Sequence, residues 1–92
     1  MRSIIIANWK MNPRTVKEAK KLAQGFTRLK KFRGKVNVIA APPFVFFSLF
    51  NPKSVLLSGQ NAFYEDRGAY TGEVSPAMLK SVGIRYVILG HS

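Results

Sequence analysis

The stretch that most constrains the fold of this chain is residues 3–12, which reads Ser-Ile-Ile-Ile-Ala-Asn-Trp-Lys-Met-Asn. A short apolar run rich in β-branched isoleucine is typical of a strand buried on both faces, and such strands occur mainly in parallel sheets. The run gives way to the polar side chains of Asn8 and Lys10. α/β proteins bind ligands at the carboxyl ends of buried strands, and an ammonium there suits an anion. The simpler alternative is a surface loop joining a strand to a helix.

Further apolar runs of strand length alternate with segments that carry helix signals. The predicted strands after the first cover residues 36–41, 55–59 and 84–89, and the predicted helices lie within residues 15–34, 44–50 and 75–83. Strands and helices alternating at these intervals form βαβ units, whose right-handed crossovers make the strands parallel. The predicted fold class is therefore α/β, with four parallel strands and three intervening helices.

Capping residues indicate where the helices begin and end. Thr15 and Glu18 fit a capping box, in which the hydroxyl accepts from an amide of the first turn and the carboxylate reaches back. Gly34 supplies a stop for that helix. Ser75 followed by Pro76 places a cap before a proline in the first helical position. Residues 44–50 are apolar on nearly every side and predict a short helix of about two turns.

The chain is strongly basic, with a net charge of +11. Between Arg14 and Lys35, nine basic residues accompany one acid, Glu18. These basic residues spread over the polar side of a predicted helix and are not interleaved with aromatic residues, so a solvated helix face is the favoured interpretation. A basic protein that binds nucleic acid is the alternative, and a steep fall in affinity with salt would identify it. We do not expect nucleic acid to be a partner, because stacking aromatic side chains do not accompany the charge.

Other sequence features exclude several classes of protein. The chain has no cysteine, so it forms neither a disulfide framework nor a Cys-based metal site. His91 is its single histidine and cannot join a histidine cluster around a metal. No glycine-rich phosphate loop follows the first strand, which argues against a nucleotide site. The opening apolar run is too short for a signal peptide and no segment is long enough to span a bilayer, so we expect a cytosolic protein without a membrane partner.

Four motifs together resemble the triosephosphate isomerase family in their order and spacing. They are residues 8–12 (Asn-Trp-Lys-Met-Asn), 59–61 (Gly-Gln-Asn), 70–75 (Tyr-Thr-Gly-Glu-Val-Ser) and 87–92 (Val-Ile-Leu-Gly-His-Ser). The likeness covers essentially the whole chain. It implies a TIM (β/α)8 barrel of which residues 1–92 form the amino-terminal half of one incomplete domain, truncated after the fourth strand.

The resemblance also implies a reaction and a set of site residues. The substrate would be a triose phosphate, interconverted between dihydroxyacetone phosphate and D-glyceraldehyde 3-phosphate by proton transfer, without a cofactor or a metal. Lys10 matches the lysine that binds the substrate and stabilises the enediolate, and Asn8 matches the asparagine that positions the substrate oxygens. His91 matches the neutral imidazole that polarises the carbonyl group, as is established for the family. Thr71, Gly72 and Glu73 match the loop that enters the partner subunit of the family homodimer.

Part of the family's machinery has no counterpart in these motifs. The general-base glutamate, the lid that closes over the substrate and the later phosphate loop are all missing, so we expect residues 1–92 alone to be inactive. One hypothesis is therefore the amino-terminal part of a triosephosphate isomerase of glycolysis and gluconeogenesis. The alternative is a half-barrel module that works only when a complementary half-barrel chain, or a further copy in a homo-oligomer, completes it.

Overall fold

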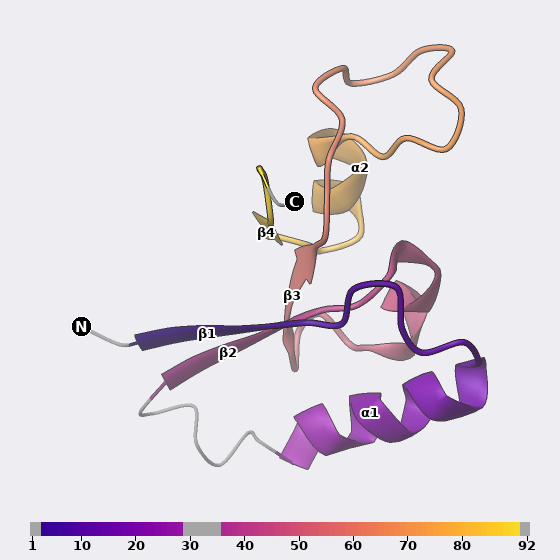
Figure 1. The fold of residues 1–92 in the computed structure, drawn as a ribbon. Coiled ribbons are helices and arrows are strands. Elements are labelled where there is room, and N and C mark those ends of the chain that lie inside the picture. Colours follow the sequence, from indigo (N-terminus) through magenta and orange to yellow (C-terminus); the bar gives the residue numbers. More distant parts are fainter. Residues whose placement is uncertain (1–2, 29–35, 91–92) are drawn as a thin grey trace.

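The computed structural model describes residues 3–28 and 36–90. In this part of the chain strands and helices alternate as the sequence predicts (Figure 1). The strands are β1 (Ser3–Asn8), β2 (Val36–Ala41), β3 (Leu56–Gly59) and β4 (Tyr86–Val87). The helices are α1 (Val16–Arg28), the 3-10 helix η2 (Phe44–Leu49) and α2 (Pro76–Ser81).

Several boundaries differ from the predicted ones because local turns take up the flanking residues. The last strand, predicted over 84–89, is only Tyr86–Val87. It starts later than predicted because the Ile84 amide closes the end of α2 by donating to the Leu79 carbonyl at 2.9 Å. The third strand begins at Leu56 instead of 55 because the Val55 amide donates to Asn51 in a turn. The short second helix has 3-10 geometry. Hydrogen bonds between residues three apart, such as Phe46 N to Pro43 O at 3.0 Å, suit so short a run.

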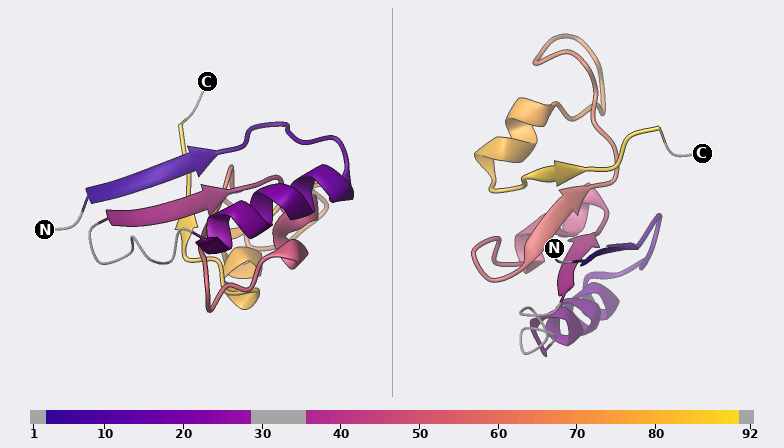
Figure 2. Two further views of the ribbon diagram at one scale, coloured as in Figure 1. Left: turned by 90° about the horizontal axis from the view of Figure 1, so that it is seen from below. Right: turned by 90° about the vertical axis from the view of Figure 1, so that its left-hand side faces the viewer.

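The four strands form one parallel sheet in the order β1-β2-β3-β4. Ser3 pairs with Val36 at the start of the β1–β2 ladder, and Asn8 pairs with Ala41 at its end. The sheet curls, so that β3 and β4 run in a very different direction from β1 (Figures 1 and 2). This curled arrangement of parallel strands with intervening helices agrees with the first half of a (β/α)8 barrel.

The hydrophobic core lies between β2, β3, η2 and α2. The carboxyl-terminal half of β2 is fully buried, with Ile39 1% exposed and Ala40 and Ala41 0% exposed. Ala23 of α1 belongs to the same core cluster as Ala40 of β2. Because both side chains are small, the helix and the strand can pack closely. Helix α1 lies along one face of β1 and β2 in both Figure 1 and the left view of Figure 2.

One half of the predicted capping box, the bond to the Thr15 hydroxyl, forms at the start of α1, and the predicted Ser75 cap forms at the start of α2. The Thr15 hydroxyl accepts from the Glu18 amide at 3.2 Å. The Ser75 hydroxyl accepts from the Met78 amide at 3.1 Å, with Pro76 directly after the cap. The predicted stop at Gly34 lies outside the described residues. Side-chain caps of this kind typically stabilise a helix by about 1 kcal/mol, so both helix starts are fixed by local sequence.

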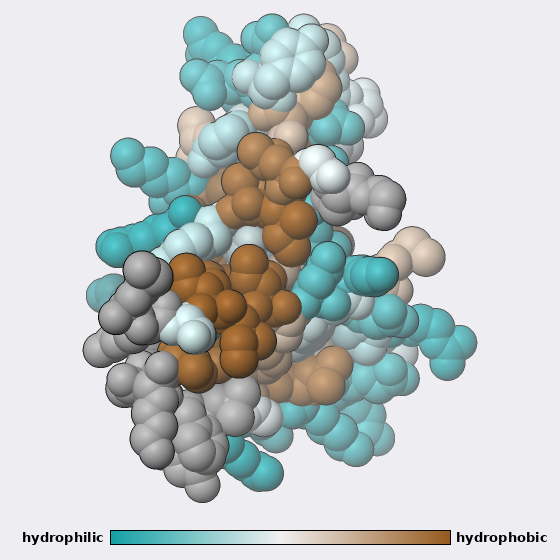
Figure 3. Space-filling model, turned by 60° about the vertical axis from the view of Figure 1, so that its left-hand side comes forward, coloured by the Kyte–Doolittle hydropathy of each residue, from teal (hydrophilic) through white to brown (hydrophobic). Residues whose placement is uncertain are grey.

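The prediction that β1 is buried on both faces is wrong for the structure described. Ile4, Ile5 and Ile6 are 59%, 53% and 46% exposed. Within residues 3–28 and 36–90, β1 is an edge strand that pairs only with β2, and α1 lies against one face of the sheet alone. At the opposite edge, Leu89 just beyond β4 is 67% exposed. Figure 3, in which the left-hand side of Figure 1 is turned toward the viewer, shows a broad apolar area on that side of the molecule.

A glycine within α1 gives a test of the helix. Gly25 lies inside the helix, and a Cβ placed on it would meet no atom within 4 Å. Alanine there should raise the free energy of unfolding by about 0.5–1 kcal/mol, because glycine loses more backbone entropy in a helix. Urea unfolding followed by circular dichroism measures the change. Gly72→Ala is the matched control: its surroundings are equally open but its φ is +82°, so it should destabilise. A destabilising Gly25→Ala would contradict the assignment of α1.

Candidate active site

Polar residues lie at the carboxyl ends of two strands, β1 and β3, on the same edge of the sheet. Asn8 ends β1 and pairs with Ala41 at the end of β2, while Gln60 directly follows β3. Because the strands are parallel, these positions meet at the carboxyl ends, where (β/α) proteins place their ligands. The sequence predicted a ligand site at this edge for Asn8 and Lys10. His91, which the family resemblance adds to the site, lies outside the described residues.

Lys10 adopts an uncommon backbone conformation two residues after β1. Its φ is +57°, and among the described residues it is the only one other than glycine with a positive φ. A left-handed conformation at such a residue costs about 1–3 kcal/mol and persists only where its surroundings enforce it. Strain of this kind concentrates at functional sites. The side chain is exposed, so its ammonium group is accessible to an anion.

Hydrogen bonds on both sides of Lys10 hold this conformation. The Asn8 Oδ1 atom accepts from the Lys10 amide at 2.9 Å. The Gln60 Nε2 group donates to the Lys10 carbonyl at 2.8 Å and to the Ala41 carbonyl at 2.7 Å. Asn8 thus uses its side-chain oxygen locally, and its Nδ2 group is the donor that can meet a ligand. The sequence did not predict the hydrogen bonds of Gln60, because its only signal was a polar residue directly after a strand.

An aromatic cluster anchors the residue before Lys10. The Trp9 ring lies 5.5 Å from Phe50 and 6.2 Å from Phe26, centroid to centroid, and its amide donates to the Ala41 carbonyl at 3.1 Å. Phe26 belongs to α1 and Phe50 directly follows η2. Tilted aromatic pairs at these separations contribute about 0.5–1.5 kcal/mol each beyond the area they bury. The turn that carries Lys10 is therefore tied to two helices as well as to the sheet.

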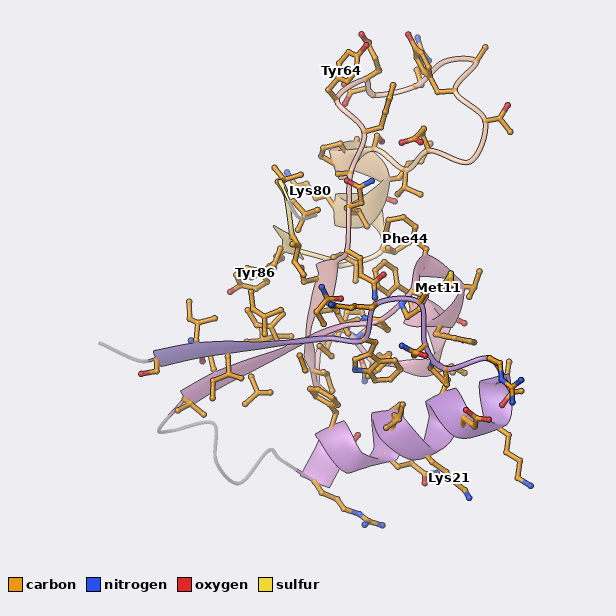
Figure 4. The ribbon with its side chains drawn as sticks, in the orientation of Figure 1. Met11, Lys21, Phe44, Tyr64, Lys80 and Tyr86 are labelled. Carbon is orange, nitrogen blue, oxygen red and sulfur yellow. The ribbon has the colours of Figure 1, made fainter. Side chains whose placement is uncertain are left out.

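The predicted interface residues Thr71, Gly72 and Glu73 lie elsewhere, on the long loop between β3 and α2. All three are exposed. The Phe63 amide donates to the Val74 carbonyl at 2.8 Å and closes the base of the loop. Figure 4 shows Tyr64, on this loop, far from Met11, which marks the turn next to Lys10. The structure therefore brings Asn8, Lys10 and Gln60 together, and it holds residues 71–73 apart from them.

The Lys10 side chain is exposed, and none of the five cavities described for residues 3–28 and 36–90 is lined by Asn8, Lys10 or Gln60. Two cavities of about 570 and 670 Å³ border α2 and β4, where Gly83 and Tyr86 line both. In the described residues, no three acidic or histidine side chains come together as metal ligands. None of the described helices is both long and apolar enough to cross a bilayer.

Four parallel strands in a curled sheet, with helices between them, match the first half of a (β/α)8 barrel and place the chain in the (β/α)-barrel class. The family model described as triosephosphate isomerase matches residues 3–92. The chain therefore belongs to the triosephosphate isomerase family, as its four motifs suggested.

Triosephosphate isomerases of several bacteria are similar to this chain over nearly its full length. The enzyme of Caldanaerobacter subterraneus subsp. tengcongensis is 45% identical over 95 residues, covering 99% of this chain and 38% of the relative. That of Thermodesulfovibrio yellowstonii is 47% identical, again over 99% of this chain and 38% of the relative. The enzyme of Dehalococcoides mccartyi strain CBDB1 is 48% identical over 100 residues, covering 100% and 38%. The chain thus spans 38% of the length of these relatives.

Proposed function

We propose that this chain supplies the amino-terminal part of a triosephosphate isomerase, which interconverts dihydroxyacetone phosphate and D-glyceraldehyde 3-phosphate by proton transfer. The observation that carries the proposal is the strained backbone of Lys10, held by hydrogen bonds at the carboxyl end of β1. The enzyme would serve glycolysis and gluconeogenesis in the cytoplasm and would use no cofactor.

Each site residue has a distinct role in this proposal. The Lys10 ammonium binds the anionic substrate and stabilises the negative charge that develops on the enediolate oxygens. The Asn8 Nδ2 group orients the substrate oxygens, while its Oδ1 atom fixes the Lys10 amide. His91, outside the described residues, acts as the neutral electrophile known in the family. Residues 71–73 enter a partner subunit, which their exposure on a projecting loop supports.

The charge of Lys10 can be tested in a hybrid in which residues 1–92 replace the matching part of the Thermodesulfovibrio yellowstonii enzyme. Lys10→Met should lower kcat/KM by about 10²–10³-fold or more, since it removes a group that stabilises transition-state charge. Lys10→Arg keeps the charge and alters the geometry, so it should lose at least about tenfold less. Steady-state kinetics in both directions measure the two variants. Equal losses would show that the point charge is not what Lys10 contributes.

We also propose that residues 1–92 need a second half-barrel for activity. The family's general-base glutamate has no counterpart among the four motifs, and a positioned base typically contributes 10²–10⁴-fold. The purified 92-residue chain should therefore show no turnover above buffer, and adding a chain that carries the remaining strands of a relative should restore some rate. Turnover by the 92-residue chain after removal of contaminating enzyme would refute this requirement.

The exposed sheet edges should make the 92-residue chain self-associate. Unpaired edges present amides and carbonyls to other strands, and Ile4 is 59% exposed on one of them. Sedimentation at low micromolar concentration should show association that strengthens with salt, because each copy carries a charge of +11. Ile4→Lys should weaken it, whereas Val45→Lys, a control on η2 where the native side chain is 79% exposed, should not. A compact monomer at every concentration would contradict the prediction.

A further inference from the structure

The two peptide groups that flank the Lys10 Cα atom are held by different parts of the chain. The group before it is held locally, because the Lys10 amide donates to Asn8 Oδ1 at 2.9 Å. The group after it is held from a distance, because the Lys10 carbonyl accepts from Gln60 Nε2 at 2.8 Å. Gln60 stands fifty residues further along the chain. Rotation of Lys10 to an ordinary negative φ changes the relative orientation of these two peptide groups, so it would break at least one of the two hydrogen bonds.

The orientation of the Gln60 amide follows from its partners. Both groups within hydrogen-bond distance are backbone carbonyl oxygens, of Lys10 and Ala41, and these can only accept. The nitrogen of the amide must therefore face them, and its two hydrogens serve one carbonyl each. Gln60 is half-buried, and so is its bond to the Ala41 carbonyl, whereas its bond to the Lys10 carbonyl is exposed to solvent. Among the common side chains, only a primary amide of this length offers both donors from one uncharged atom at this place.

The Ala41 carbonyl links the hydrogen bonds around Lys10 to the end of β2. It accepts from the Trp9 amide at 3.1 Å and from Gln60 Nε2 at 2.7 Å. Ala41 is completely buried at the end of β2, and Gln60 directly follows β3. One carbonyl oxygen and one side-chain nitrogen therefore connect the ends of β2 and β3 to the turn after β1. The position of Lys10 relative to the other strand ends depends on this connection.

We propose that Gln60 is a positioning residue, which holds the Lys10 backbone in its left-handed conformation and so aims the ammonium group at the anion site. Gln60 acts through the Lys10 carbonyl and does not itself touch the substrate. The kinetic consequence rests on the proposed function, but the conformational effect does not. Asn8 alone fixes only the amide side of Lys10, so without Gln60 the residue relaxes to a negative φ and the ammonium moves.

The conformational part is tested by NMR on the 92-residue chain carrying Ile4→Lys, the substitution that should weaken its self-association. A residue with φ near +60° has a short distance between its amide and α protons and therefore a strong intraresidue NOE. Lys10 should show that signal in this chain and lose it in Gln60→Met, which keeps the length of the side chain without its donors. Gln60→Asn keeps the amide but shortens its reach, so it should also lose the signal. Gln24→Met, on the exposed surface of α1, is the matched control and should keep it.

The kinetic part uses the hybrid with the Thermodesulfovibrio yellowstonii enzyme and a double-mutant cycle. Gln60→Met should lower kcat/KM by about 10–10²-fold, as expected for a misplaced catalytic group. In the Lys10→Met background the same change should cost less than about twofold, because no ammonium remains to be misplaced. If Gln60 merely stabilised the fold, Gln60→Met would lower kcat/KM by the same factor in both backgrounds. Gln24→Met should leave kcat/KM unchanged.

The outcomes separate the two proposals. If Lys10 keeps its strong NOE in Gln60→Met, or if the kinetic losses are equal in the two backgrounds, the positioning role is wrong. If the NOE is lost but Lys10→Met leaves the hybrid fully active, Gln60 does hold the backbone and it is the proposed function that fails. If Gln60→Met does not fold as a 92-residue chain, the cycle in the hybrid decides.

Discussion

The parallel pairing of β1 with β2 is the constraint on which the candidate site depends. Its register sets Asn8 opposite Ala41, so that both strands end at the same level. The Ala41 carbonyl then lies within reach of both the Trp9 amide and the Gln60 side chain. A shift of one residue would turn every side chain of β1 to the opposite face and carry the turn around Lys10 away from Ala41.

The sequence predicted the parts of this structure that depend on near neighbours. Apolar runs marked the strands, and the caps at Thr15 and Ser75 form with the amides expected of them. The polar residues at strand ends were also placed at the correct edge, because parallel pairing brings any such ends together. These predictions need only interactions between residues close in sequence, together with one rule of topology.

The features that the sequence did not predict depend on contacts between distant residues or on which elements cover a strand. The bonds from Gln60 to Lys10 and Ala41 join positions fifty and nineteen residues apart, and no local pattern encodes them. The burial of Ile4–Ile6 was overestimated because an apolar run shows that a strand can be buried, while its exposure depends on which elements cover it. The last strand was predicted to start too early because Ile84, apolar like Val87 and Ile88, completes the turn after α2 instead.

The basic charge and the site occupy different surfaces of the molecule. On α1 the basic residues Lys17, Lys20 and Lys21 are exposed, whereas the one aromatic residue of this helix, Phe26, packs inward against Trp9 and Phe50. Figure 4 shows Lys21 on the side of α1 that faces away from the strands. The helix therefore presents charge without stacking surfaces, which matches the solvated face that its pattern favours.

Stability and site geometry draw on different interactions in this half-barrel. Burying an isoleucine side chain fully stabilises a fold by about 1.5–3 kcal/mol, and Ile4, Ile5 and Ile6 realise only part of that. The hydrogen bonds around Lys10, by contrast, are all made within the described residues. Further strands placed against β1 would add burial without supplying any of those bonds. The half-barrel thus contains the geometry of the lysine turn, whereas much of the burial available to its outermost strand depends on closure of the sheet.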